Sequence, residues 1–97
     1  MKIIWSPRSK SQLIEFAEYI ASDKPEAAHR WLENVFKEVE KLKVFPKSGR
    51  KVPELNQDKI REIIFGNYRI IYKIEVEEII IVSVRHGRQL LDTNEIK

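Results

Sequence analysis

The sequence predicts an α+β fold in which a helical hairpin packs on one face of a mainly antiparallel sheet. Two amphipathic segments follow each other near the N-terminus, and three apolar, β-branched segments come after them. Helices and strands that occupy separate parts of a chain are typical of α+β domains. A short strand before the first helix completes the expected order β-α-α-β-β-β. The length of 97 residues predicts one domain over residues 1–97.

The two helices are predicted from the spacing of apolar residues and from the residues at their starts. Ser6 followed by Pro7 is typical of a helix start, because serine caps the first turn and proline tolerates the first helical position. Apolar residues then recur at helical spacing over residues 7–21. A second stripe predicts a helix over residues 24–44, with Asp23 as its cap. The short gap between them predicts an antiparallel hairpin.

The strands are predicted from short apolar runs rich in β-branched residues. These runs cover residues 59–65, 68–74 and 78–85, and a shorter run at residues 3–5 precedes the first helix. Gly66 and Asn67 are typical of a two-residue hairpin turn, which would pair the strands on either side of it. The polar segment 46–58, which contains prolines and a glycine, is expected to form a loop.

The turn at Gly66 and Asn67 decides which side chains share a face, because side chains alternate along paired strands. Tyr68, Ile70 and Tyr72 are then expected to lie under the helices. The opposite face, which we call the open face, is expected to form a mixed apolar and charged surface. Its members are Ile60, Glu62, Ile64, Arg69, Ile71 and Lys73.

The last predicted strand has no clean alternation, since Ile79 to Val82 are continuously apolar. Two helices cover only one face of a sheet, so exposed apolar surface is expected on the open face. The alternation that directs Val84 toward the helices directs Ile79, Ile81 and Arg85 outward. A partner protein or the apolar residues of the C-terminal tail could cover this face, and the pattern does not decide between them.

Three arginines are expected to converge on the open face. Arg69 and Arg85 lie there by alternation, and Arg88 follows just beyond the strand end. Such a group suits a phosphate or carboxylate partner, while solvated and scattered arginines are the competing interpretation. His86 has an ordinary pKa suited to general-base chemistry. Alternation nevertheless directs His86 toward the helix side, where a structural hydrogen bond is expected.

The composition narrows the class of protein. Lys and Arg number 18 against 15 Asp and Glu, so the net charge of +3 permits a nucleic-acid partner without requiring one. The chain has no cysteine, which excludes disulfides and thiolate metal sites and is compatible with a reducing cytoplasm. No apolar run reaches the length of a membrane span. We therefore expect a cytoplasmic protein that contacts no membrane and needs no metal or cofactor.

Several short segments together resemble the RelE/ParE toxin superfamily. They are Trp5-Ser6-Pro7, Tyr19-Ile20-Ala21, Phe45-Pro46-Lys47-Ser48-Gly49-Arg50, Ile60-Arg61-Glu62, Gly66-Asn67-Tyr68-Arg69-Ile70-Ile71-Tyr72 and Val84-Arg85-His86-Gly87-Arg88. Their order and topology are similar to that superfamily over nearly the whole chain. The resemblance implies the toxin of a type II toxin-antitoxin pair, neutralised by a cognate antitoxin that packs across it.

The superfamily divides into two target classes, and the resemblance is closer to the second. RelE-like members cut messenger RNA on the ribosome without a metal, using basic residues of the open face, and Arg69 matches one of their arginines. Those enzymes carry lysines where this chain has Ile60 and Glu62, and many have a tyrosine near the C-terminus, which this tail lacks. ParE-like members instead inhibit DNA gyrase, and the loop after the second helix looks ParE-like.

The resemblance therefore implies a gyrase inhibitor that acts by binding rather than as an enzyme. The first alternative is a RelE-like messenger RNA endonuclease that acts on the ribosome, and the second is a non-toxic module that only binds the antitoxin. The residues expected to contact a partner are Ile64, Arg69, Ile71, Ile79, Ile81, Arg85 and Arg88. The candidate catalytic residues under the ribonuclease alternative are Arg69, Arg85, His86 and Arg88.

Overall fold

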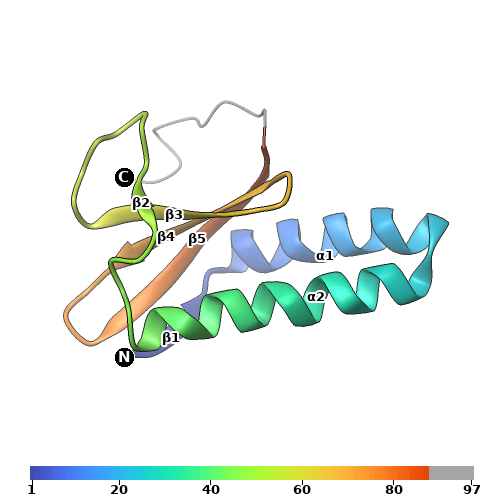
Figure 1. Ribbon diagram of the computed structural model, residues 1–97, viewed down its shortest axis with the longest axis horizontal. Helices are drawn as coiled ribbons and strands as arrows, with labels where there is room; N and C mark the ends of the chain where they lie inside the picture. The colour runs from blue at the N-terminus through green and yellow to red at the C-terminus, as the bar shows by residue number, and fades with distance from the viewer. Residues whose placement is uncertain (88–97) are drawn as a thin grey trace.

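The computed structural model describes residues 1–87, and these residues form a helical hairpin packed against one face of a five-stranded sheet (Figure 1). The elements are β1 (Lys2–Trp5), α1 (Pro7–Asp23), α2 (Pro25–Glu40), the 3-10 helix η1 (Lys41–Lys43), β2 (Arg50–Lys51), β3 (Ile60–Phe65), β4 (Tyr68–Ile74) and β5 (Glu78–His86). The strand order is β1-β5-β4-β3-β2, with β1 parallel to β5 and the other pairs antiparallel. The predicted α+β fold is confirmed.

The start of α1 follows the prediction, while the start of α2 does not. The Ser6 hydroxyl accepts a hydrogen bond from the backbone N–H of Ser9 at 3.1 Å, and Pro7 is the first helical residue. The prediction that Asp23 caps α2 is wrong, because α1 continues through Asp23. The helical conformation is interrupted at Lys24 instead, whose backbone is extended with φ of −140°. Pro25 accounts for this, since proline disfavours helical conformation in the residue before it.

The main core lies between the helical hairpin and the sheet. Its buried members come from both helices, η1, β4 and β5, and they are Leu13, Val35, Val39, Leu42, Ile70, Tyr72, Ile79 and Ile81. Tyr68 lies on the same side, where its ring contacts Phe16 and Trp31. The helix-facing positions predicted on β4 are therefore confirmed.

The prediction that Ile79 and Ile81 face outward is wrong, since both side chains are fully buried in the main core. The physical reason is a bulge in β5. Ile71 pairs with Ser83 whereas its neighbour Tyr72 pairs with Ile81, so Val82 is an extra residue between them. An extra residue reverses the face of every side chain before it relative to a regular alternation.

The open face is largely covered by the chain itself, which corrects the expectation of a broad apolar surface there. We call residues 52–58, between β2 and β3, the strap. Val52 of the strap is fully buried against Ile60 and Ile71, and Leu55 packs beside them. Ile64 alone among the predicted apolar contacts remains half exposed. The proposed alternative cover, the C-terminal tail, lies outside the described residues.

The segment before the strap is not only a loop, because it contains the two-residue strand β2. The Tyr72 hydroxyl donates to the carbonyl of Pro46 at 2.6 Å and accepts from the N–H of Gly49 at 3.0 Å. A Cβ atom at Gly49 would lie 2.6 Å from both the Glu62 carbonyl oxygen and the Tyr72 hydroxyl oxygen. Only glycine allows the backbone to come this close to Glu62 and Tyr72. This close contact places Arg50 beside β3.

The outer edge of β5 is protected beyond the point where β1 ends. β1 pairs with β5 only as far as Trp5, opposite Ile81. The side-chain oxygen of Gln12 on α1 then accepts from the N–H of Val84 at 2.8 Å and from the Ser83 hydroxyl at 3.1 Å. An exposed strand edge is a template for unwanted pairing. Gln12 therefore protects a part of the β5 edge that β1 leaves unpaired. Within residues 1–87 no helix is both long and apolar enough to span a membrane.

Candidate functional site

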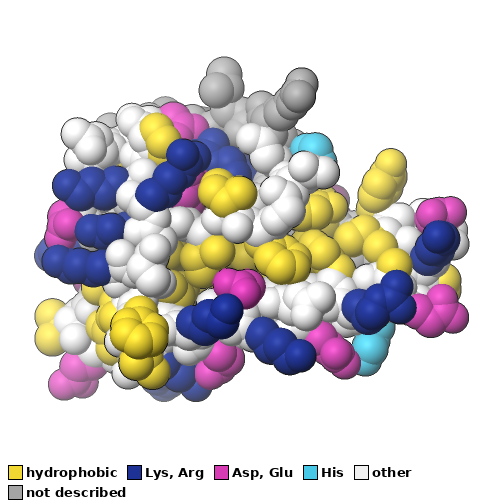
Figure 2. All heavy atoms as spheres, in the orientation of Figure 1, with side chains coloured by type: hydrophobic (Ala, Val, Ile, Leu, Met, Phe, Trp, Pro, Cys, Tyr) yellow, Lys and Arg dark blue, Asp and Glu magenta, His cyan; other side chains and the backbone are white. Residues whose placement is uncertain are grey.

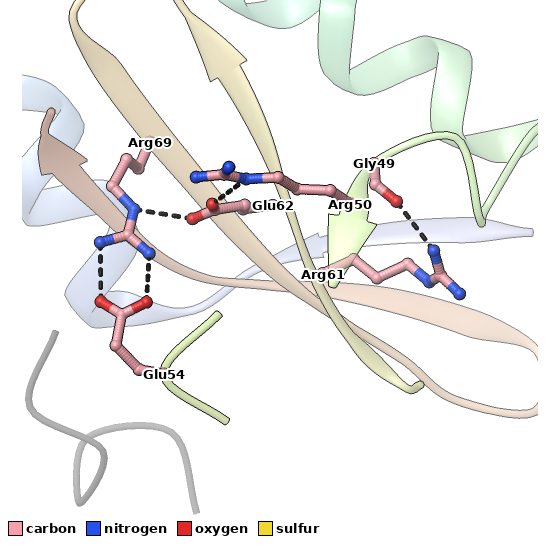
Figure 3. Close-up of polar contacts among 6 residues, drawn as sticks. All are labelled: Gly49, Arg50, Glu54, Arg61, Glu62 and Arg69. Atoms are coloured by element: carbon pink, nitrogen blue, oxygen red, sulfur yellow. Dashed lines mark hydrogen bonds and ion pairs between the residues drawn. The ribbon is translucent and has the colours of Figure 1, made fainter. Parts of the chain in front are cut away.

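Four charged side chains form a connected group on the open face, which we call the ion cluster: Arg50, Glu54, Glu62 and Arg69 (Figure 3). Arg69 on β4 lies at its centre. Its Nε donates to Glu62 at 2.7 Å, and its two terminal nitrogens donate to the two oxygens of Glu54 at 2.8 Å each. The second oxygen of Glu62 accepts from Arg50 Nε at 2.6 Å.

The solvent exposure of the ion cluster increases from its centre, at Glu62 and Arg69, to Arg50 at its rim. The side chain of Glu62 is 0% exposed and that of Arg69 9%, whereas Arg50 is 59% exposed. The hydrogen bonds to Glu54, followed by those to Glu62, raise the pKa of Arg69 although burial opposes them. A buried charge is tolerated only when it is paired and hydrogen-bonded. The cluster meets this requirement for both Glu62 and Arg69.

The sheet register explains how three members of the ion cluster meet. Arg50 pairs with Glu62 across β2 and β3, and Ile64 pairs with Arg69 across β3 and β4. Side chains of Arg50, Glu62 and Arg69 therefore project from one face. The register predicted from the sequence already put Glu62 and Arg69 on this face, so their ion pair was within reach. Glu54 comes from the irregular strap, where no periodicity could have pointed to it.

The other predicted site residues are distributed over both faces. Arg85 pairs with Arg69 in the register of β4 and β5, so it shares the open face as expected. His86 lies on the helix side, with its ring 5.5 Å from that of Tyr68, and the predicted direction of this side chain is confirmed. Ile71 is buried under the strap. Arg88 lies outside the described residues.

Comparison with known proteins identifies the family. A family model described as the ParE toxin of the type II toxin-antitoxin system, parDE, matches residues 3–91. The chain belongs to the ParE toxin family. The resemblance predicted from the sequence motifs is confirmed, including its ParE-like character. The chain is thus the toxin component of a type II toxin-antitoxin system. No curated protein sequence matches it.

A solved structure supports the fold of this ParE-family toxin. The structure is described as the chromosomal ParDE TA system from P. aeruginosa, and it superposes with a TM-score of 0.73. The match covers 89% of this chain and 95% of that chain, at 17% sequence identity. The shared architecture extends over nearly the whole of both chains.

The ion cluster of this ParE-family toxin is poorly arranged for RNA cleavage. Attack of a 2′-hydroxyl on its phosphate needs cations directed at the charge that develops there. Each side-chain nitrogen of Arg69 instead donates to a carboxylate of Glu54 or Glu62. Two carboxylates at this position would also repel a phosphate. Among residues 1–87, no group of three His, Asp or Glu side chains could hold a metal ion instead.

Two hollows flank Arg50, one at the edge of the sheet beside α2 and one on the open face. The first has a volume of about 380 Å³ and is lined by Glu38 of α2 and Lys41 of η1 as well as by Ile64. The other, of about 510 Å³, is lined by Glu54, Ile64 and Arg69. Ile64 and Arg50 thus offer an exposed apolar side chain beside an exposed cation. This combination suits contact with an acidic, partly apolar protein segment better than catalysis.

A second surface, which the sequence patterns did not indicate, lies where α2 ends and β1 begins. Figure 2 shows hydrophobic side chains gathered at this end of the molecule. Val44 and Phe45 are exposed there, and Val76 in the β4–β5 turn is 94% exposed. They line a hollow of about 710 Å³ together with Met1. The available signal was an apolar pair directly before Pro46, outside the helical stripe.

Proposed function

We propose that this ParE-family toxin inhibits DNA gyrase by binding to it, and that a cognate antitoxin neutralises it. The observation that carries the proposal is the pairing of Arg69 with Glu54 and Glu62. The arginine that resembles a ribonuclease residue is engaged by carboxylates of its own chain. A toxin whose open face is arranged in this way acts by contact with a protein target rather than by cleaving RNA.

The residues beside Arg69 support the same proposal. Ile60 and Glu62 stand where RelE-like ribonucleases carry lysines, and both side chains are buried. Glu62 is negatively charged at a position where RNA chemistry would need a cation. The RelE-like alternative would therefore have to rely on the remaining candidates, Arg85, His86 and Arg88.

The antitoxin is expected to contact the exposed part of the open face. The similar P. aeruginosa structure is a ParDE TA system, which supports an antitoxin partner for this chain as well. Ile64 is half exposed between the two hollows, with Arg50 beside it. We propose these two residues, with Arg85, as antitoxin contacts. Arginine is enriched at protein interfaces, and the buried centre of an interface is more apolar than its rim.

The gyrase proposal is tested with the purified toxin, relaxed plasmid, ATP and DNA gyrase. We expect loss of supercoiling or accumulation of cleaved plasmid, and recovery of activity when the antitoxin is added first. The antitoxin is sought as the product of the reading frame next to the toxin gene. Full supercoiling at a large molar excess of folded toxin would refute the gyrase proposal.

The two alternatives have separate readouts in growing cells. Expression without the antitoxin should arrest growth, and normal growth at high expression would favour a non-toxic antitoxin-binding module. Sequencing of transcript ends shortly after induction addresses the ribonuclease alternative. We expect no new cuts at codon-specific positions, because the open face carries two carboxylates around Arg69.

A further inference from the structure

We propose that Glu54 is a specificity-determining residue that makes the open face reject the phosphate groups of nucleic acids. This inference deepens the proposed function, because it explains how a basic open face can serve a protein target without retaining RNA. Its starting point is the bidentate pair between Glu54 and Arg69, with both contacts at 2.8 Å. A carboxylate in this geometry takes the position that a phosphate would take on an arginine.

The strap holds Glu54 in place, so the carboxylate is supplied at high effective concentration. Val52, two residues before Glu54, is fully buried, and Leu55, the next residue, packs against the same cluster. The backbone N–H groups of Leu55 and Asn56 both bond to the carbonyl of Val52, which closes the turn. A ligand from solution must compete with an intramolecular group, and such competition is strongly unfavourable.

The charge balance shows why this one carboxylate matters. Within the ion cluster, Arg50 and Arg69 stand against Glu54 and Glu62, two cations against two anions. Without Glu54 the cluster would carry an excess of one positive charge, and the two terminal nitrogens of Arg69 would lose the carboxylate that they bind beside the 510 Å³ hollow. Basic surfaces of this kind attract nucleic acid through counterion release.

Glu62 cannot perform the same role as Glu54. Its side chain is fully buried and is shared between Arg50 and Arg69 through its two oxygens. It neutralises the buried positive charge of Arg69 through Nε but does not contact the two terminal nitrogens of that arginine. Glu54 binds those two nitrogens and is 22% exposed, so it is the group that an incoming phosphate would meet. Specificity therefore depends on the strap residue rather than on the strand residue.

The test compares Glu54→Gln with Glu18→Gln, a control that makes the same change in net charge on the exposed surface of α1. Binding of a short fluorescein-labelled single-stranded RNA is measured by anisotropy over a range of salt concentrations. We expect E54Q to bind about tenfold more tightly than wild type at low salt, with a salt dependence steeper by about one phosphate contact. E18Q should stay within about twofold of wild type.

Equal RNA affinity of E54Q and E18Q would overturn the proposal. Circular dichroism and thermal melts establish that each variant is folded. Should E54Q not fold, Glu54→Asp decides the question. Its side chain is shorter by one methylene, so the carboxylate keeps its charge but is drawn back from the two terminal nitrogens of Arg69. E54D should then gain about threefold in RNA affinity, and no gain would contradict the proposal. The readout is RNA affinity, so its outcome is independent of whether the toxin inhibits gyrase.

Discussion

At the scale of single residues, Arg69 shows how neighbours change the meaning of a motif. It belongs to the segment Tyr68–Tyr72 that carries the clearest resemblance to the toxin superfamily. Its chemistry is nevertheless set by Glu62, which is buried beside it, and by Glu54 from the strap. The motif therefore identifies the family, while the ion pairs indicate how the arginine is used.

Arg69→Ala is expected to destabilise the fold by about 3 kcal/mol, because removing one partner of a buried ion pair leaves the other uncompensated. Glu62 would keep only Arg50, which is mostly exposed. Urea unfolding measures the loss. Arg30→Ala, at an exposed position on α2, is the control and should change stability by less than about 0.5 kcal/mol. Equal effects of the two substitutions would contradict a structural role for the ion cluster.

Tyr72→Phe is expected to cost about 1–2 kcal/mol at neutral pH, because the N–H of Gly49 and the carbonyl of Pro46 lose their partner. Thermal melts of wild type and Y72F measure this cost. The same variant should also change the dependence of stability on alkaline pH.

Burial raises the pKa of the Tyr72 hydroxyl above its ordinary value of 10.0. The unfolded chain therefore releases this proton at a lower pH than the folded protein does. The stability that the neutral hydroxyl contributes is complete below pH 10.0 and is lost as pH rises through the folded pKa. Wild type should thus lose stability more steeply than Y72F in this range, and parallel curves would show that Tyr72 does not contribute. Tyr68, whose pKa is also raised, is common to both proteins.

Sequence reasoning reached some of these residues and missed others for physical reasons. Alternation from the Gly66–Asn67 turn correctly placed Arg69 and Glu62 on one face, because β3 and β4 pair without irregularity. Glu54 escaped prediction because its position depends on a strap with no repeating pattern. Arg50 escaped prediction because β2 has only two residues and is held by long-range contacts with Tyr72 and Glu62.

At the scale of elements, β5 differs most from its prediction. Its continuous apolar run was expected to leave apolar surface exposed on the open face, whereas the structure covers it with the helices on one side and with the strap-side cluster on the other. The bulge at Val82 turns both Ile79 and Ile81 to the helix side, opposite to the predicted face. A continuous apolar run contains no polar residue to mark a face, so a bulge within it leaves no trace in the sequence. The helices were predicted more accurately because Ser6 and Pro7 mark the start of α1 and Pro25 lies at the start of α2, although the predicted cap at Asp23 was wrong.

Gln12→Ala is expected to loosen the free edge of β5. The substitution removes the acceptor of the Val84 N–H and of the Ser83 hydroxyl, both of which are buried. We expect a loss of about 1–2 kcal/mol and faster hydrogen exchange at the Val84 amide. Gln12→Glu retains an oxygen acceptor and should keep most of the protection. Unchanged exchange in Q12A would show that α1 does not protect this edge.

At the scale of the whole molecule, one face of the sheet carries the main core, and the other is the face that we propose for recognition. The helical hairpin and the main core occupy the first face (Figure 1). The strap and the ion cluster occupy the second and leave Ile64 and Arg50 accessible. The architecture was predictable from element order and periodicity, since both survive small errors of register. The division of the open face was not, because it depends on contacts between residues far apart in the sequence.

The central claim is that this ParE-family toxin acts on a protein target and does not cleave RNA. The most direct test induces the toxin in cells and measures plasmid topology and transcript ends in the same samples, shortly after induction. We predict a loss of negative supercoiling or the appearance of cleaved plasmid, with transcripts intact. Codon-positioned transcript cuts in cells whose plasmid supercoiling is unchanged would contradict the claim.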